Sequence, residues 1–275
     1  MSSSKAIARL PLHLVLCVVA AIFVYPMVWT VLTAFRSPAE FALSPWALPT
    51  GLYLSNFVEA WNLIGIGRLL LNSLVVSLGA TTLACLFGLM AAYAIVRSRS
   101  RAIMAVQLLF LAAMFVPFDV MMVSLFVSLR QMGMLNTYPG LIGPYVALNL
   151  PLIILILTNA VREVPGEIIE SAKIDGANSW QILFGMIAPI IWPSIAAAAV
   201  LSFVGNWNEF VIALVAMPSP TMQTLPVGIA GFINPTMPRY ELTFAGIVIS
   251  MVPMLVVFVT LQRFFLAGVT AGAVK

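Results

Sequence analysis

The sequence predicts an all-α membrane protein with six transmembrane helices and both termini in the cytoplasm. First, 62% of its 275 residues are hydrophobic and 8% are charged, and the mean hydropathy is +1.09. A soluble domain is about half apolar and about a quarter charged. Second, six stretches reach the roughly 20 apolar residues that a spanning helix needs. Third, most basic residues fall on one side of these stretches.

The first apolar stretch, Leu12–Ala34, is longer than the about 7–15 residues of a signal-peptide core, so we expect a retained span. Prolines such as Pro117 and Pro253 predict kinked helices, which neighbours in a bundle can tolerate. The other five stretches are Leu69–Val96, Ile103–Ser128, Tyr138–Ala160, Ile191–Met217 and Leu242–Leu266.

The basic residues predict the orientation of these spans. Nine of the 13 fall in segments on one side, and three of them lie between Arg97 and Arg101. The other four are Arg36, Arg68, Arg130 and Arg239. Since basic residues accumulate in cytoplasmic loops, both termini are expected inside. With no linker and no internal repeat, we expect a single transmembrane domain over residues 1–275.

Several function classes are excluded by what the sequence lacks. The basic residues form no stripe, so we expect no nucleic acid partner. Cys17, Cys85 and the lone His13 make no disulfide framework or metal spacing. No lysine stands in the Gly-Lys-Ser/Thr sequence of a P-loop, so any ATP chemistry must lie on another chain. The chain is therefore expected to be no enzyme and to hold no cofactor or metal.

One connection, Val161–Ile190, differs from the rest and is called the charged segment below. It holds four of the nine acidic residues. Pro165 can open a helix, Gly176 can end it with a positive φ, and Ile169 and Ala172 share one face of it. A second short helix could run from Asn178 towards Pro189. This shape suits a groove on a partner protein or, equally, an amphipathic loop resting on lipid headgroups.

The charged segment also resembles a known signature. Its residues Glu170-Ser171-Ala172-Lys173-Ile174-Asp175-Gly176-Ala177, with Pro189 thirteen residues after the glycine, resemble the cytoplasmic loop of bacterial ABC importer permeases of the maltose type. Asn72-Ser73, Ala92-Tyr93-Ala94, Trp207-Asn208-Glu209-Phe210 and Gly272-Ala273-Val274-Lys275 are similar to the same family. Ser171, Met186 and Ala188 depart from its pattern.

The resemblance implies a permease of a sugar or sugar-like solute in the bacterial inner membrane. Its implied partners are a second homologous permease, two ATPase subunits that hold ATP and Mg, an extracytoplasmic solute-binding protein and membrane lipid. The implied ATPase-coupling loop lies at about residues 161–190. Its implied coupling residues are Glu170, Ser171, Ala172, Asp175, Gly176, Ala177 and Pro189.

Polar groups inside the expected spans suggest a second site. Ionisable side chains within a bilayer should face other helices or water. Asp119, Glu209, Asn72 and Asn206 are therefore candidates for a translocation path, although hydrogen bonding between helices would explain them too. The alternative function is a self-contained secondary transporter or channel that uses Asp119 and Glu209. That alternative leaves the charged segment unexplained.

Overall fold

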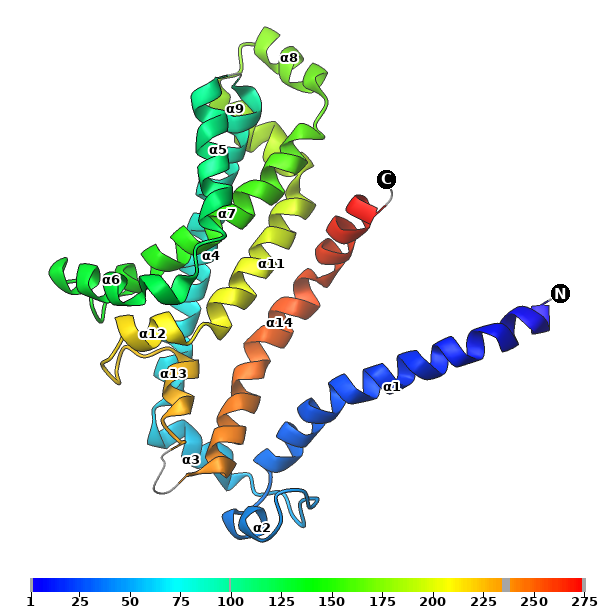
Figure 1. Cartoon of the computed structure of the whole chain (residues 1–275), viewed down its shortest axis with the longest axis vertical. Coiled ribbons are helices and arrows are strands. Elements are labelled where there is room, and N and C mark those ends of the chain that lie inside the picture. Colours follow the sequence, from blue (N-terminus) through cyan, green and yellow to red (C-terminus); the bar gives the residue numbers. More distant parts are fainter. Residues whose placement is uncertain (1, 99, 234–237, 274–275) are drawn as a thin grey trace. The chain divides into compact units, whose positions relative to one another are not determined.

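A computed structural model describes the backbone of residues 2–98, 100–233 and 238–273, and the side chains of residues 13–98, 100–117, 120–233 and 238–260. Within those residues every assigned element is helical, which confirms the all-α prediction. The helices (Figure 1) are α1 (Ser2–Ala34), α2 (Pro38–Leu43), α3 (Ser55–Leu63), α4 (Ile66–Arg97), α5 (Arg101–Ala113), α6 (Phe118–Gln131), α7 (Tyr138–Arg162), α8 (Gly166–Ile174), α9 (Ser179–Ile182), the π-helix η1 (Leu183–Ile187), α10 (Ala188–Ile190), α11 (Trp192–Asn208), α12 (Val211–Ala216), α13 (Leu225–Ala230) and α14 (Tyr240–Ala273).

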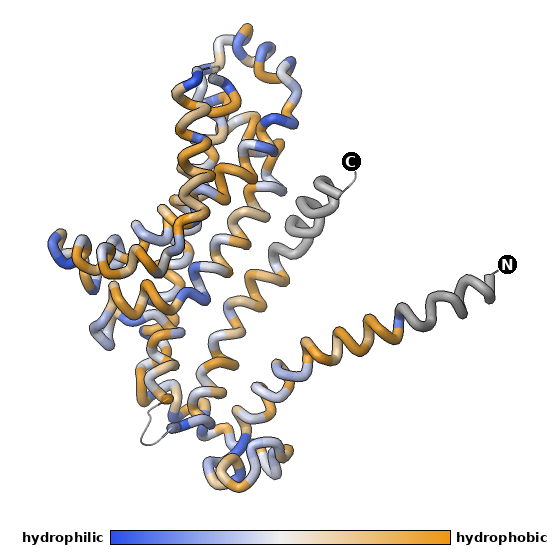
Figure 2. Tube along the Cα trace, in the orientation of Figure 1, coloured by the Kyte–Doolittle hydropathy of each residue, from blue (hydrophilic) through white to orange (hydrophobic). Residues whose placement is uncertain are grey.

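The long helices make the chain a multi-pass membrane protein. Four described helical stretches are long and apolar enough to cross a bilayer, and their orange colouring stands out in Figure 2. A fifth crossing is available if α9–α10 and α11, which meet at 81°, count as one broken span. The four stretches are His13–Ala34, Ile66–Arg97, Tyr138–Arg162 and Tyr240–Thr260.

Two of the expected spans are not single helices. The stretch Ile103–Ser128 divides into α5 and α6, because Pro117 has no N–H and disfavours the helical conformation of the residue before it. The stretch Ile191–Met217 divides where Glu209 adopts an extended conformation, with φ −66° and ψ 130°. The kink expected at Pro117 is thus a complete break between two helices, and a second break lies at Glu209, where no proline predicts one.

The chain forms two compact units. The first comprises residues 1–67 and 228–252, and the second comprises residues 68–227 and 253–275. In the first unit Arg36 is buried, and its guanidinium donates to the carbonyls of Glu40, Ser44 and Pro45. The Ser37 N–H donates to the Glu40 carboxylate over 2.9 Å. The hydrogen bond from the Thr50 hydroxyl, and after it this bond from Ser37, lower the pKa of Glu40.

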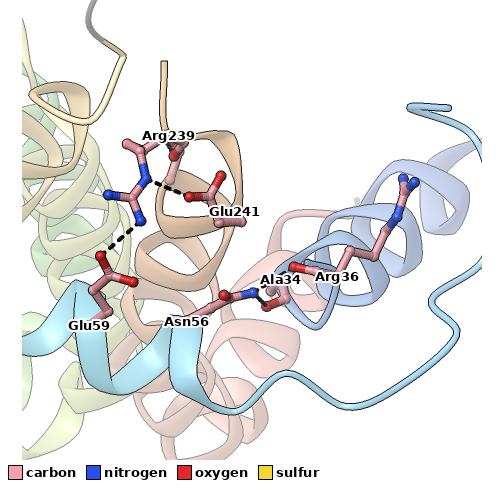
Figure 3. A network of polar contacts seen from close by, with 7 residues as sticks. Ala34, Arg36, Asn56, Glu59, Arg239 and Glu241 are labelled. Carbon is pink, nitrogen blue, oxygen red and sulfur yellow. Dashed lines mark hydrogen bonds and ion pairs between the residues drawn. The ribbon is translucent and has the colours of Figure 1, made fainter. Parts of the chain in front are cut away.

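A second polar cluster of the first unit joins segments distant in the sequence (Figure 3). Arg239 pairs through Nη2 with Glu59 Oε1 at 2.8 Å and through Nε with Glu241 Oε1 at 2.6 Å. These carboxylates raise the pKa of Arg239 further. Asn56 donates to the carbonyls of Ala34 and Arg36, over 2.9 and 2.8 Å. The connection between α1 and α3 is thus held by buried hydrogen bonds.

The second unit has a helical core in which α7 packs against α5, α11 and α12. Helix α4 approaches α7 closely at Gly88, where an added Cβ would stand 2.5 Å from Ile153 Cγ2. Leu89, Ala92, Ile153 and Leu157 are buried in one cluster that also includes side chains of α8. This core therefore carries the charged segment.

Candidate functional site

The first helix of the charged segment, α8, has one buried and one exposed face. Ile169 and Ala172 are each 4% exposed and pack into the core cluster formed with α4 and α7. Glu167, Glu170 and Lys173 are exposed, and the trace of α8 is partly blue, or hydrophilic, in Figure 2. The shared face predicted for Ile169 and Ala172 is confirmed, and it packs α8 against α4 and α7.

The turn after α8 depends on Gly176, whose φ is +81°. The Gly176 N–H donates to the Lys173 carbonyl over 3.0 Å, and the Ala177 N–H donates to the Ala172 carbonyl over 2.9 Å. These paired bonds resemble those of a Schellman motif, which satisfies carbonyls at a helix end. No atom lies within 4 Å of a Cβ added to Gly176. The backbone conformation, and not the available space, therefore calls for glycine here.

The second half of the charged segment begins with a capping box. Asn178 Oδ1 accepts the N–H groups of Trp180 and Gln181, each over 3.0 Å, and Gln181 Oε1 accepts the Asn178 N–H over 2.8 Å. The expected second helix from Asn178 towards Pro189 is confirmed, with a π-helical section in its middle. It ends at Ile191, where the chain turns by 81° into α11.

Six of the seven expected coupling residues lie on α8 or in the turn at Gly176. Ser171, Asp175 and Gly176 are exposed, Ala177 is half-buried, and Pro189 is exposed in α10. The first six lie on α8, which projects in Figure 1, and on the turn that follows it, whereas Pro189 lies beyond α9 and η1 in α10. Their role in coupling stays a prediction.

Two apolar side chains on this protrusion were missed from the sequence. Ile174 is 87% exposed and Trp180 is 58% exposed. The Trp180 ring stacks on Phe184, with centroids 5.8 Å apart and planes 3° from parallel. Exposed apolar side chains on a segment with exposed carboxylates suit a protein partner. Periodicity does not reveal it, because Ile174 and Trp180 read as ordinary buried positions.

The second candidate site contains Glu209, in the break between α11 and α12. Its Oε1 accepts the Ile212 N–H over 2.8 Å, and its Oε2 accepts the Ala213 N–H over 3.1 Å. The Tyr145 hydroxyl, on α7, donates to Oε2 over 2.7 Å. Glu209 therefore caps α12 and ties it to α7, as expected for a structural role. It directly follows the last residue of α11, Asn208.

Asn206 joins three helices in the same region. Its Nδ2 lies 3.3 Å from both Thr81 Oγ1 on α4 and Ser202 Oγ on α11. Its Oδ1 accepts from Asn149 Nδ2 on α7 over 2.9 Å. Thr81, Ser202 and Asn206 are all buried. The buried amide is thus satisfied by neighbouring helices, as interhelical bonding predicts.

Asn72 belongs to a separate cluster. Its Nδ2 donates to the carbonyls of Thr221 and Gln223, over 3.1 and 2.9 Å, and its Oδ1 accepts the Tyr138 hydroxyl over 2.8 Å. Asn72 holds the connection after α12 against α4 and α7. Among the candidate path residues, Asn206 and Glu209 are both bonded to α7, through Asn149 and Tyr145 respectively. The side chain of Asp119 lies outside the described residues, although its backbone belongs to α6.

Comparison with known proteins identifies relatives over nearly the whole chain. Residues 84–270 match the family described as binding-protein-dependent transport system inner membrane component. The chain is 33% identical to the diacetylchitobiose uptake system permease protein of Streptomyces coelicolor, covering 100% of this chain and 91% of that protein. It is 30% identical to the melibiose/raffinose/stachyose import permease protein of Bacillus subtilis, covering 95% of each.

Solved structures share the fold. A chain of a bacterial ABC transporter that imports the acidic polysaccharide alginate matches with a TM-score of 0.81 and 20% identity, covering 96% of this chain and 99% of that one. A chain of a bacterial alginate ABC transporter, solved with a periplasmic protein bound to an alginate pentasaccharide, matches with a TM-score of 0.65 and 18% identity, covering 94% and 95%.

Proposed function

The chain belongs to the binding-protein-dependent transport system inner membrane components, as a permease of the carbohydrate-uptake ABC importers, and from this premise we propose how it works. The charged segment transmits the movement of separate ATPase subunits to the spans, and a sugar or sugar-like solute then crosses the bilayer. The observation that carries the proposal is the protrusion of α8 and α9. Its inner face is anchored by Ile169 and Ala172, and its outer face presents Glu170, Ile174 and Asp175.

This arrangement suits the transmission of movement from α8 to the spans. The anchoring side chains share one buried cluster with Leu89 and Ala92 on α4 and Leu157 on α7. Because packed interiors transmit displacement, a force on the exposed face would reach these spans. Exposed carboxylates beside apolar side chains supply both charge and contact area for a partner groove.

The proposed topology has six crossings, with both termini in the cytoplasm of a bacterial inner membrane. Helices α5 and α6 together form the third crossing, since α5 has 13 residues and a span needs roughly 20. Helix α11 with α12 forms the fifth. The excess of arginine at the connection from Arg97 to Arg101 supports this orientation.

The proposed partners are a second homologous permease, two ATPase subunits and an extracytoplasmic solute-binding protein. ATP and Mg belong to the ATPase subunits, and this chain carries no cofactor. The alginate importer solved with its periplasmic protein supports a binding-protein partner. The family match favours this function over a self-contained transporter, and Glu209, one of the two residues that such a transporter would use, carries backbone hydrogen bonds as a cap.

Replacing Gly176 tests directly whether the charged segment transmits this movement. Proline fixes φ near −65° and cannot adopt +81°. We expect Gly176→Pro to insert into the membrane normally, to keep ATP hydrolysis by the assembled importer and to lose solute uptake. Membrane content, ATPase rate and uptake are measured on the same vesicles. Normal uptake by this variant would contradict the proposal.

A matched pair separates backbone strain from bulk. No atom lies within 4 Å of a Cβ added at Gly176 or at Gly166. Of these two glycines, Gly176 alone has a positive φ. Gly176→Ala strains the turn by about 1–2 kcal/mol, and we expect reduced uptake per ATP hydrolysed. Gly166→Ala should keep the wild-type ratio. An equal effect of both substitutions would show that the turn is not the determinant.

A further inference from the structure

A cavity that includes none of the coupling residues lies where α4, α5 and α7 end or begin. It has a volume of about 240 Å³ and is partly open. Arg162, Ser98, Ser100 and Gln107 provide its polar lining, and Ile95 and Met104 are among its apolar lining. We call it the Arg162 cavity. It lies within the second unit and shares no lining residue with the polar groups around Glu209.

The polar lining of the Arg162 cavity offers donors to an anion. Arg162 is exposed at the last turn of α7, and its guanidinium is always charged. Ser98 Oγ accepts the Ser100 N–H over 3.1 Å, and Ser100 Oγ accepts the Ala102 N–H over 3.3 Å. Because each oxygen acts as an acceptor there, each hydroxyl proton can be donated. Within the described part of the chain, no acidic side chain lines the cavity.

The position of the cavity indicates what kind of anion it receives. It lies at the ends of two stretches long enough to span the bilayer, Ile66–Arg97 and Tyr138–Arg162, where lipid headgroups are found. Apolar side chains on α5 extend from its rim, since Met104 is 62% and Leu108 is 63% exposed. A ligand that matches both surfaces has a phosphate at one end and a hydrocarbon chain at the other.

We propose that the Arg162 cavity binds the phosphate of an anionic phospholipid from the cytoplasmic leaflet. Arg162 pairs with the phosphate, the two serine hydroxyls donate to its oxygens, and the acyl chains lie along α5. Basic pockets between transmembrane helices on the cytoplasmic side are suited to such headgroups. The assignment of this side to the cytoplasm rests on the proposed topology. The charged segment begins at the end of α7, so the lipid would lie beside it.

Lipid binding to the detergent-purified importer, measured by native mass spectrometry, tests the proposal. Phosphatidylglycerol is titrated against phosphatidylethanolamine, whose headgroup has no net charge. We expect phosphatidylglycerol to bind preferentially and Arg162→Gln to weaken its binding about fivefold. Arg162→Lys should retain most of the binding because it keeps the charge. Arg130→Gln is the matched control, since Arg130 is an exposed arginine at the end of α6, outside the cavity.

Three results would overturn the proposal. One is equal binding of both lipids. Another is an equal loss in Arg162→Gln and Arg130→Gln. The third is displacement of the lipid by inorganic phosphate, which would make the cavity a site for free phosphate. Solute uptake is recorded separately, so a failed lipid assay with normal uptake leaves the proposed transport function standing.

Discussion

Glu209 is the residue on which the junction between α11 and α12 depends. Its carboxylate accepts two backbone N–H groups and the Tyr145 hydroxyl. An unsatisfied backbone group in a bilayer is costly, because no water replaces the lost partner. A carboxylate at this break therefore has a structural reason to exist that is independent of any solute.

Replacing Glu209 by alanine should destabilise the importer. Glu209 precedes the N-cap position, Phe210, but accepts the same N–H groups as an N-cap side chain. Loss of such a cap costs about 0.5–2 kcal/mol, and we expect a lower melting temperature of the purified complex. Tyr145→Phe removes one of the three bonds and should cause a smaller decrease. Unchanged melting of Glu209→Ala together with lost uptake would favour a place for Glu209 in the translocation path.

At the scale of elements, the contact between α4 and α7 is set by a glycine. An alanine Cβ at position 88 would stand 2.5 Å from Ile153 Cγ2, so the helices would have to separate or Ile153 to change rotamer. We expect Gly88→Ala to cost about 1–3 kcal/mol, as overpacking does. Thermal unfolding of the purified complex measures this.

Gly143→Ala is the control for that substitution. Gly143 also lies within a long helix, α7, and no atom lies within 4 Å of an added Cβ. Alanine has the higher helix propensity, so stability should be unchanged or slightly higher. If Gly88→Ala were equally harmless, close packing would not hold α4 against α7.

At the scale of the whole molecule, the testable property is the orientation across the membrane. In a variant without Cys17 and Cys85, single cysteines are introduced at Ser44 and Ser179, both exposed. An impermeant maleimide added to cells with a permeable outer envelope should label Ser44→Cys at once, and Ser179→Cys only after the inner membrane is opened. The reverse pattern would invert the proposed topology.

The membrane class and helical fold follow from local properties of the chain. Long apolar stretches must form their backbone hydrogen bonds internally, and this holds whatever they pack against. The same applies to the turn of the charged segment. Gly176 permits a positive φ, and the spacing of Ile169 and Ala172 places both on one face of α8. These features were predicted from the sequence.

The breaks and partnerships within the spans depend on contacts between distant residues. Glu209 meets Tyr145 across 64 positions of the sequence, and Asn206 is satisfied from α4 and α7. Periodicity predicts which face of a helix is apolar, but it does not say which neighbour satisfies a polar group. For the same reason the exposed Ile174 and Trp180 and the Arg162 cavity were not foreseen. Exposure and enclosure result from packing, which arises when segments far apart in the chain come together.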